Sequence, residues 1–168
     1  RNSIDLFSDL LLAEVQEVEM YENERAFGIH FLGNYVLVFK LFGNRANLIL
    51  YRDGEYDSQF QKRLKKDDEL ALNTISRSID QSFEAFQAAE GEYFPLFPTL
   101  GKEAQTWLAA QGYENLNLKD RWALLQQMLE ILDEEHFYVV KTLKGIGFTL
   151  FPPSEDSLYK SKDPIAAL

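Results

Sequence analysis

The sequence predicts an α+β fold: a small antiparallel β-sheet, a helical lobe after it and a late β-hairpin. The first part of the 168-residue chain contains short apolar runs separated by Gly-Asn and Asp-Gly pairs, which are typical of antiparallel hairpins. The middle part then changes to apolar residues at every third or fourth position, which is the helical period. A chain of this length can bury one sizeable core or form two small packed lobes.

Four antiparallel strands are expected in the first part. Residues 13–21 alternate between apolar and acidic side chains, as in a half-exposed strand. Three further apolar runs follow at residues 26–32, 35–42 and 46–52. The pairs Gly33-Asn34 and Gly43-Asn44 supply the positive φ that tight hairpin turns need. The sequence therefore predicts a four-stranded meander.

Three helices and a second hairpin are expected after it. Apolar residues from 72 to 86 recur at helical spacing and predict an amphipathic helix of about five turns that ends near Gly91. Thr99 is expected to cap a second helix that runs to residue 111, and Asn117 to cap a third. Residues 137–143 and 146–151 flank a Lys144-Gly145 turn and predict the late hairpin.

These elements divide the chain into four parts. We expect a strand meander at residues 1–66, a helical lobe at 67–135, a closing hairpin at 136–153 and a mobile tail at 154–168. The sheet is expected to form a sandwich or a half-barrel that the late hairpin closes. The sequence begins at Arg1 without a methionine and ends in what resembles the first turn of a helix. We therefore expect it to be a fragment of a larger protein.

Composition restricts the classes of function. The chain has 27 acidic and 17 basic residues, for a net charge of −10, and no cysteine. RNA-binding domains are normally basic, so a nucleic-acid role would require a local basic patch or another part of the protein. Disulfides and thiolate metal sites are excluded. We expect a cytoplasmic protein, because the sequence shows neither a signal peptide nor an apolar run long enough to cross a membrane.

The sequence does not predict an enzyme. His30 and His136 are isolated, whereas a metal site needs three or four converging ligands. No nucleophile elbow, P-loop or dinucleotide-binding fingerprint occurs. We therefore expect no catalytic residue, no metal and no cofactor, and we interpret the protein as a binding module.

Three segments are candidates for binding. Glu24-Arg25 is either a local surface ion pair or a guanidinium fork for a phosphate, oriented by the carboxylate. The polar side chains at the mouth of a predicted hairpin either serve the turn or form a recognition edge, and they are Asn44, Arg45 and Asn47. Lys102 follows a Pro-x-x-Gly turn that opens a helix, which resembles half of a helix-hairpin-helix motif and would direct N–H groups and a lysine at a phosphate.

Taken in order, these segments resemble the N-terminal region of the NFACT family. That family includes ribosome-quality-control factors of the RqcH type and proteins labelled fibronectin-binding protein A. The family pattern has an Asp-Arg pair before a strand, then an apolar strand that runs into a "GRHSNIIL" segment. Here Glu24-Arg25 and residues 41–50 occupy those places. A later turn that starts a helix corresponds to residues 97–101, and a hairpin ending in "F-x-P" to residues 147–152.

The resemblance implies a fold similar to the N-terminal domain of Fpg-like DNA glycosylases, followed by a degenerate helix-hairpin-helix lobe. It implies a module that binds tRNA and the large ribosomal subunit, with weak RNA binding by the fragment alone and no DNA chemistry. It marks Glu24 and Arg25 as the functional pair, and residues 43–47 as the "GRHSN" segment. Two alternatives remain: an adhesin-like protein that binds fibronectin or fibrinogen, and a degenerate paralogue used only for protein–protein contact.

Overall fold

The computed structural model describes residues 6–41, 43–134, 136–142, 145–153, 158–163 and 165. The chain forms two compact units, Arg1–Ile79 and Asp80–Leu168. Both units combine antiparallel strands with helical turns, so the α+β class is confirmed. No helix in the described part of the chain is long and apolar enough to cross a membrane.

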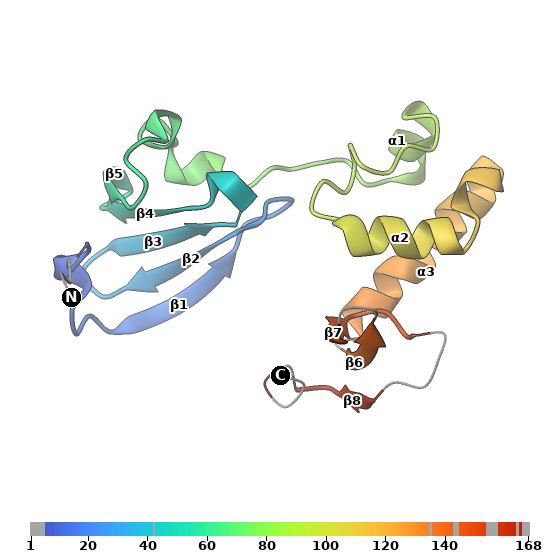
Figure 1. Ribbon diagram of the computed structural model, residues 1–168. Coiled ribbons are helices and arrows are strands. Elements are labelled where there is room, and N and C mark those ends of the chain that lie inside the picture. The colour runs from blue at the N-terminus through green and yellow to red at the C-terminus, as the bar shows by residue number, and fades with distance from the viewer. Residues whose placement is uncertain are drawn as a thin grey trace. The chain divides into compact units, whose positions relative to one another are not determined.

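Unit 1 is built on a five-stranded antiparallel meander in the order β1-β2-β3-β4-β5 (Figure 1). Its strands are β1 (Val15–Met20), β2 (Ala26–Phe31), β3 (Tyr35–Lys40), β4 (Asn47–Arg52) and β5 (Glu55–Gln59). Its short 3-10 helices are η1 (Ser8–Leu10), η2 (Gly43–Arg45), η3 (Lys65–Asp67) and η4 (Leu72–Thr74). The four expected strands are confirmed, and β5 is an addition whose sequence contains only one large apolar residue.

The turns of the meander follow from left-handed backbone positions. Gly33 and Asn34 have φ of 93° and 62°, and Asp53 and Gly54 have φ of 53° and 83°. Two consecutive residues with positive φ match the right-handed twist of the strands on either side. The register between the strands is therefore fixed locally.

The main core cluster of unit 1 lies on one face of the sheet. Its buried members are Tyr21, Ala26, Val36, Val38, Ile49, Tyr51 and Ile75. Leu70 and Leu72, from the segment after β5, pack against this cluster and so cover the sheet face. Tyr51 is fully buried, and its hydroxyl donates to the Leu70 carbonyl at 2.8 Å, which ties that segment to β4.

The expected five-turn helix over residues 72–86 is wrong. Only η4 and the short helix α1 (Phe83–Ala88) form there. The apolar residues of this stretch belong to two different cores, because Ile75 packs in unit 1 and Phe86 in unit 2. Short polar residues between them favour turns over helix. The Ser82 hydroxyl accepts from the Ala85 N–H at 3.2 Å and starts α1.

Unit 2 contains α1, two longer helices and a three-stranded sheet. Its remaining elements are α2 (Lys102–Ala110), η5 (Tyr113–Asn115), α3 (Leu118–Asp133), β6 (Phe137–Thr142), β7 (Gly145–Thr149) and β8 (Tyr159–Ser161). Its core joins the three helices and the segments around them, with Phe86, Leu108 and Leu125 among the most buried residues. The Asn117 cap is confirmed, since its side-chain oxygen accepts from the Asp120 N–H at 3.1 Å.

Helix α2 begins at Lys102 with Gly101 as its N-cap, so the expected cap at Thr99 is wrong. The Leu100 N–H donates to the Phe97 carbonyl at 3.1 Å. This bond closes a turn that buries Phe97 and Leu100 in the core of unit 2. The chain can therefore enter the helix only after this turn.

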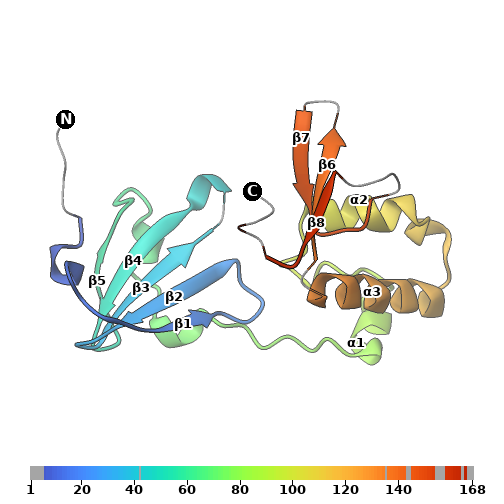
Figure 2. The same ribbon diagram turned by 90° about the horizontal axis from the view of Figure 1, so that it is seen from below.

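The late hairpin is confirmed as β6 and β7, although Leu143 and Lys144 of its turn lie outside the described residues. β6 pairs with β7 and β8 in a second sheet, ordered β7-β6-β8 (Figure 2), and forms no strand pair with the sheet of unit 1 within the described residues. Neither sheet closes into a barrel within the described residues. β8 lies in the stretch where the sequence indicated a tail without regular structure.

Candidate nucleic-acid interface

Two of the candidate segments meet at one end of the unit 1 sheet. Ala26 pairs with Lys40, and Lys40 pairs with Asn47, so the start of β2, the end of β3 and the start of β4 are level (Figure 1). The Leu41 N–H donates to the Arg25 carbonyl at 2.8 Å, just beyond that register. The Glu24-Arg25 turn and the η2 segment therefore lie at the same sheet end.

A buried polar network forms the base of this sheet end. The Lys40 ammonium pairs with one carboxylate oxygen of Asp67, and the Asn47 side-chain N–H donates to the other at 2.8 Å. The Lys40 and Asp67 side chains are only 17% and 8% exposed. A carboxylate with little access to water has to be compensated by such partners. The negative charge of Asp67 is therefore neutralised within the fold.

Asn47 also fixes the chain after β5. Its side-chain oxygen accepts from the Gln61 N–H at 2.7 Å and from the Leu48 N–H at 3.0 Å. The Gln61 side chain in turn donates to the Ala46 carbonyl at 2.6 Å. These bonds hold the basic segment that follows against β4. Asn47 is therefore a positioning residue, and it is buried rather than exposed to a ligand.

The fixed segment creates a hollow of about 300 Å³, which we call the basic groove. It is lined by Arg45, Arg63, Leu64, Lys65, Lys66 and Asp67. All four cations are exposed, whereas Asp67 is buried and paired with Lys40. The Arg63 guanidinium donates to the Gln61 side chain at 2.9 Å, which orients it. The groove therefore presents four cationic groups to solvent with little opposing charge.

Glu24 is tied to a residue far from it in the sequence of unit 1. The Glu24 carboxylate pairs with the Arg77 guanidinium, and that guanidinium also donates to the Asn23 carbonyl at 3.1 Å. The Asn23 side chain donates to the Arg77 carbonyl at 2.7 Å. Glu24 thus anchors the turn to the segment after η4. The Arg25 side chain is exposed at the end of the turn.

Asn44 and Lys102 have different surroundings. Asn44 is exposed within η2, next to Arg45. Lys102 is exposed at the first residue of α2 in unit 2, where it lines a separate groove between α2 and the end of β7. Arg45 and Asn47 therefore contribute to the basic groove, Asn44 flanks it and Lys102 belongs to the other unit.

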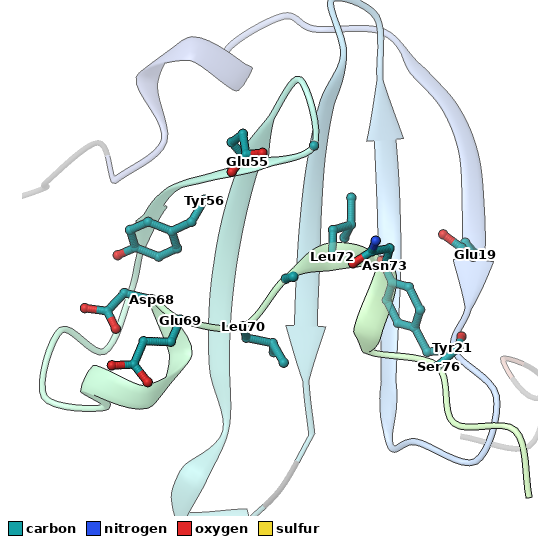
Figure 3. A pocket seen from close by; sticks show the side chains of 12 residues that line it. Glu19, Tyr21, Glu55, Tyr56, Asp68, Glu69, Leu70, Leu72, Asn73 and Ser76 are labelled. Atoms are coloured by element: carbon teal, nitrogen blue, oxygen red, sulfur yellow. The ribbon is translucent and has the colours of Figure 1, made fainter.

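A pocket of opposite charge lies elsewhere on unit 1 (Figure 3). It has a volume of about 730 Å³, and its lining includes Glu19, Glu55, Asp68 and Glu69. Figure 3 shows the segment with Leu70, Leu72 and Asn73 crossing between Glu55 on one side and Glu19 on the other. Four carboxylates repel phosphate, so this acidic pocket is unsuited to a nucleic acid.

The two histidines have local partners. His30 Nε2 lies 2.9 Å from a Glu19 carboxylate oxygen, and His136 Nδ1 lies 3.2 Å from one of Glu134. Among the described residues, no three metal-binding side chains come together as a metal site would require.

The candidate residues chosen from the sequence did not include three that line the basic groove, Arg63, Lys65 and Lys66. The available signal was four cations within five residues, placed soon after an apolar strand. Comparison with protein-family models, with curated proteins and with solved structures found no match for this chain.

Proposed function

We propose that this chain is a tRNA- and large-ribosomal-subunit-binding module of an NFACT-type ribosome-quality-control protein. The observation that carries the proposal is the basic groove, in which Arg45 joins the cations of residues 63–66 over a neutralised carboxylate. The order of the candidate segments, which resembles that family, supplies the identity of the RNA. The proposal includes an Fpg-like type of sheet, a degenerate helix-hairpin-helix around α2 and a cytoplasmic location.

The mechanism is phosphate neutralisation on a rigid base. Lysine and arginine side chains that contact phosphates release condensed counterions, which makes affinity strongly dependent on salt. The hydrogen bonds of Asn47 and Gln61 hold the basic segment in place before RNA arrives. The backbone of this segment then has little conformational freedom left to lose on binding. The protein positions RNA and performs no chemical step.

Binding of labelled tRNA to the 168-residue chain tests this role. We expect weak binding that falls steeply between about 50 and 200 mM salt. Changing Arg45, Lys65 and Lys66 together to Gln should lower affinity at least about tenfold and flatten the salt dependence. The matched control changes Lys119, Lys160 and Lys162 of unit 2 to Gln, with the same loss of charge. Equal losses for the two triple variants would remove the basic groove as the RNA site.

Arg25 is proposed as a further phosphate contact at the same sheet end. Its exposed guanidinium can offer a bidentate fork, which the point charge of a lysine cannot reproduce. Arg25→Ala is expected to weaken tRNA binding with the melting temperature unchanged, and Arg25→Lys to restore little. A fall in both affinity and melting temperature, or in neither, contradicts this role.

A protein-contact role is the second candidate, and one observation favours it. β1 is an edge strand of the sheet, and Val15, Val18 and Met20 along it are 53%, 59% and 71% exposed. Exposed apolar side chains on an edge strand favour pairing with another polypeptide. Val18→Lys would abolish such pairing and leave tRNA binding intact. If this variant fails to bind large ribosomal subunits in a pull-down but still binds tRNA, the protein-contact role is supported.

A further inference from the structure

Unit 2 contains a groove of about 690 Å³ between α2 and the chain that leaves β7. We call it the aromatic groove. It is lined by Lys102 and Trp107 from α2, by Lys141 from β6 and by Phe151 and Pro152, among others. The Trp107 ring stacks on the Phe151 ring, with centroids 5.6 Å apart and planes 19° apart. Phe151 is buried and Trp107 is half-buried, and both rings form part of the groove wall.

The net charge of the side chains that line this groove is opposite in sign to the net charge of unit 2. Unit 2 has 7 basic and 14 acidic residues, yet the groove is lined by two exposed lysines and a single glutamate, Glu103. Lys102 and Lys141 come from different elements, so the fold brings these cations together across the aromatic wall. No side chain caps the N-terminus of α2, where Lys102 begins the helix, so the N–H groups there add positive potential.

We propose that the aromatic groove binds an unpaired nucleotide of single-stranded RNA. The base stacks against Trp107, and the neighbouring phosphates lie by Lys102 and Lys141. A rigid aromatic ring flanked by cations is the arrangement with which proteins hold single strands without reading their sequence. A duplex does not fit, because its bases are paired and stacked on one another, so none of them can stack on an aromatic side chain. This inference rests on the proposed function, since it assigns an unpaired part of the bound RNA to unit 2.

Trp107 provides a direct readout, because the protein has only one other tryptophan, Trp122. In a Trp122→Phe variant of the whole chain, all tryptophan fluorescence comes from Trp107. Titration with a short oligoadenylate should quench this fluorescence, and a blunt RNA duplex at the same phosphate concentration should not. Should Trp122→Phe fail to fold, the quench of the wild-type chain is compared with that of Trp107→Phe, which keeps an aromatic ring in the groove.

Substitutions at the groove test its charge and its ring separately. Lys102→Ala and Lys141→Ala should each weaken oligoadenylate binding, whereas Lys119→Ala, with the same charge change on α3, should not. Trp107→Leu should weaken it by about fivefold or more, while Trp107→Phe should retain most of it. The inference is overturned by no quench, by an equal quench with duplex, or by an equal effect of all three lysine changes. It is likewise overturned if a proline-rich peptide quenches the Trp107 fluorescence and oligoadenylate does not.

The two proposals can fail independently. If oligoadenylate does not quench Trp107 but tRNA binding still depends on Arg45, Lys65 and Lys66, only the aromatic groove is wrong. If the quench occurs and depends on Lys102 and Lys141 while the basic-groove variant binds tRNA normally, only the basic groove is wrong.

Discussion

The two units handle charge and packing in different ways. Unit 1 has 10 basic and 13 acidic residues, a net charge of −3, and unit 2 has 7 and 14, a net charge of −7. Unit 1 places its cations together over the buried pair of Lys40 and Asp67. Unit 2 places two of its lysines, Lys102 and Lys141, in a groove that Trp107 and Phe151 also line. An overall charge of −10 therefore conceals two hollows that are each lined by more basic than acidic side chains.

The same contrast holds inside the units. A hydrogen-bonded network around Asp67 holds the segment that covers one end of the unit 1 sheet. In unit 2, Phe83, Phe86 and Trp122 pack edge to face or tilted at 5.1–5.8 Å. A polar network fails when one partner is lost, whereas an aromatic core fails when a ring is removed. Substitutions can therefore be aimed at one unit at a time.

The largest effect is expected from Phe86→Ala. Phe86 is fully buried beside Trp122, and removal of such a ring costs about 3–5 kcal/mol. Both tryptophans lie in unit 2, so tryptophan fluorescence during urea unfolding follows this unit. Amide hydrogen exchange in β3 and β4 follows unit 1 and should be nearly unchanged. Matching losses in both probes would mean that the units unfold as one.

Asp67→Ala is expected to lower the free energy of unfolding of unit 1 by about 3 kcal/mol. The reason is that it leaves the little-exposed Lys40 ammonium and the Asn47 amide without their acceptor. The control is Asp68→Ala, which removes the same charge from the next, exposed residue. Faster amide exchange in β4 for Asp67→Ala alone checks this expectation. If the two variants behave alike, the network does not hold the basic segment.

Alkaline pH should weaken both units. Burial raises the pKa of Tyr51 in unit 1 and of Tyr113 in unit 2 to about 12, from about 10 in an unfolded chain. The folded state keeps each proton longer than the unfolded state does. The stability contributed is therefore complete below about pH 10 and is lost, on the order of 2 kcal/mol per tyrosine, as pH rises to about 12.

A tyrosine-to-phenylalanine change isolates this pH effect. Tyr113→Phe removes the titrating group together with its hydrogen bond to the Gly91 carbonyl at 2.8 Å. At about pH 9 the variant should be less stable than the wild type by about 1 kcal/mol. Between about pH 9 and about pH 11, roughly one pH unit either side of an ordinary tyrosine pKa, it should then lose less stability than the wild type does. Urea unfolding followed by tryptophan fluorescence measures both values. Equal losses would assign the pH effect to other groups.

Asn117→Ala should give the smallest effect, about 1 kcal/mol in unit 2, because α3 loses its N-cap bond. Asn115→Ala is the matched control, since its exposed side chain lies two residues earlier and caps no α-helix. The difference between their midpoints in urea gives the contribution of the cap. A midpoint for Asn117→Ala equal to that of the control would show that α3 does not need it.

The fold was predictable where local chemistry decides it. Gly33-Asn34 fixes a hairpin, and Asn117 fixes a helix start, because each acts within a few residues. The failures were non-local. The helical spacing from Leu72 to Phe86 gave a false helix because its residues serve two cores, and β5 was missed because its partner strand, rather than its own composition, makes it a strand.

The candidate site was only partly predictable. Arg45 and Asn47 were singled out for their place at a turn, but the sequence could not distinguish an exposed cation from a buried positioning amide. The pairing of Glu24 with Arg77 and that of Lys40 with Asp67 join residues far apart in the chain. Only the fold shows which charges are already compensated, and this decides which cations remain available to a ligand.

The change of sign within residues 62–69 has a kinetic consequence. Four cations are followed by Asp67, Asp68 and Glu69, so the basic groove and the acidic pocket adjoin along the chain. An approaching polyanion is repelled by the net charge of −10 at long range and attracted only within about 10 Å of the groove. Higher ionic strength would therefore speed the encounter while it shortens the lifetime of the complex.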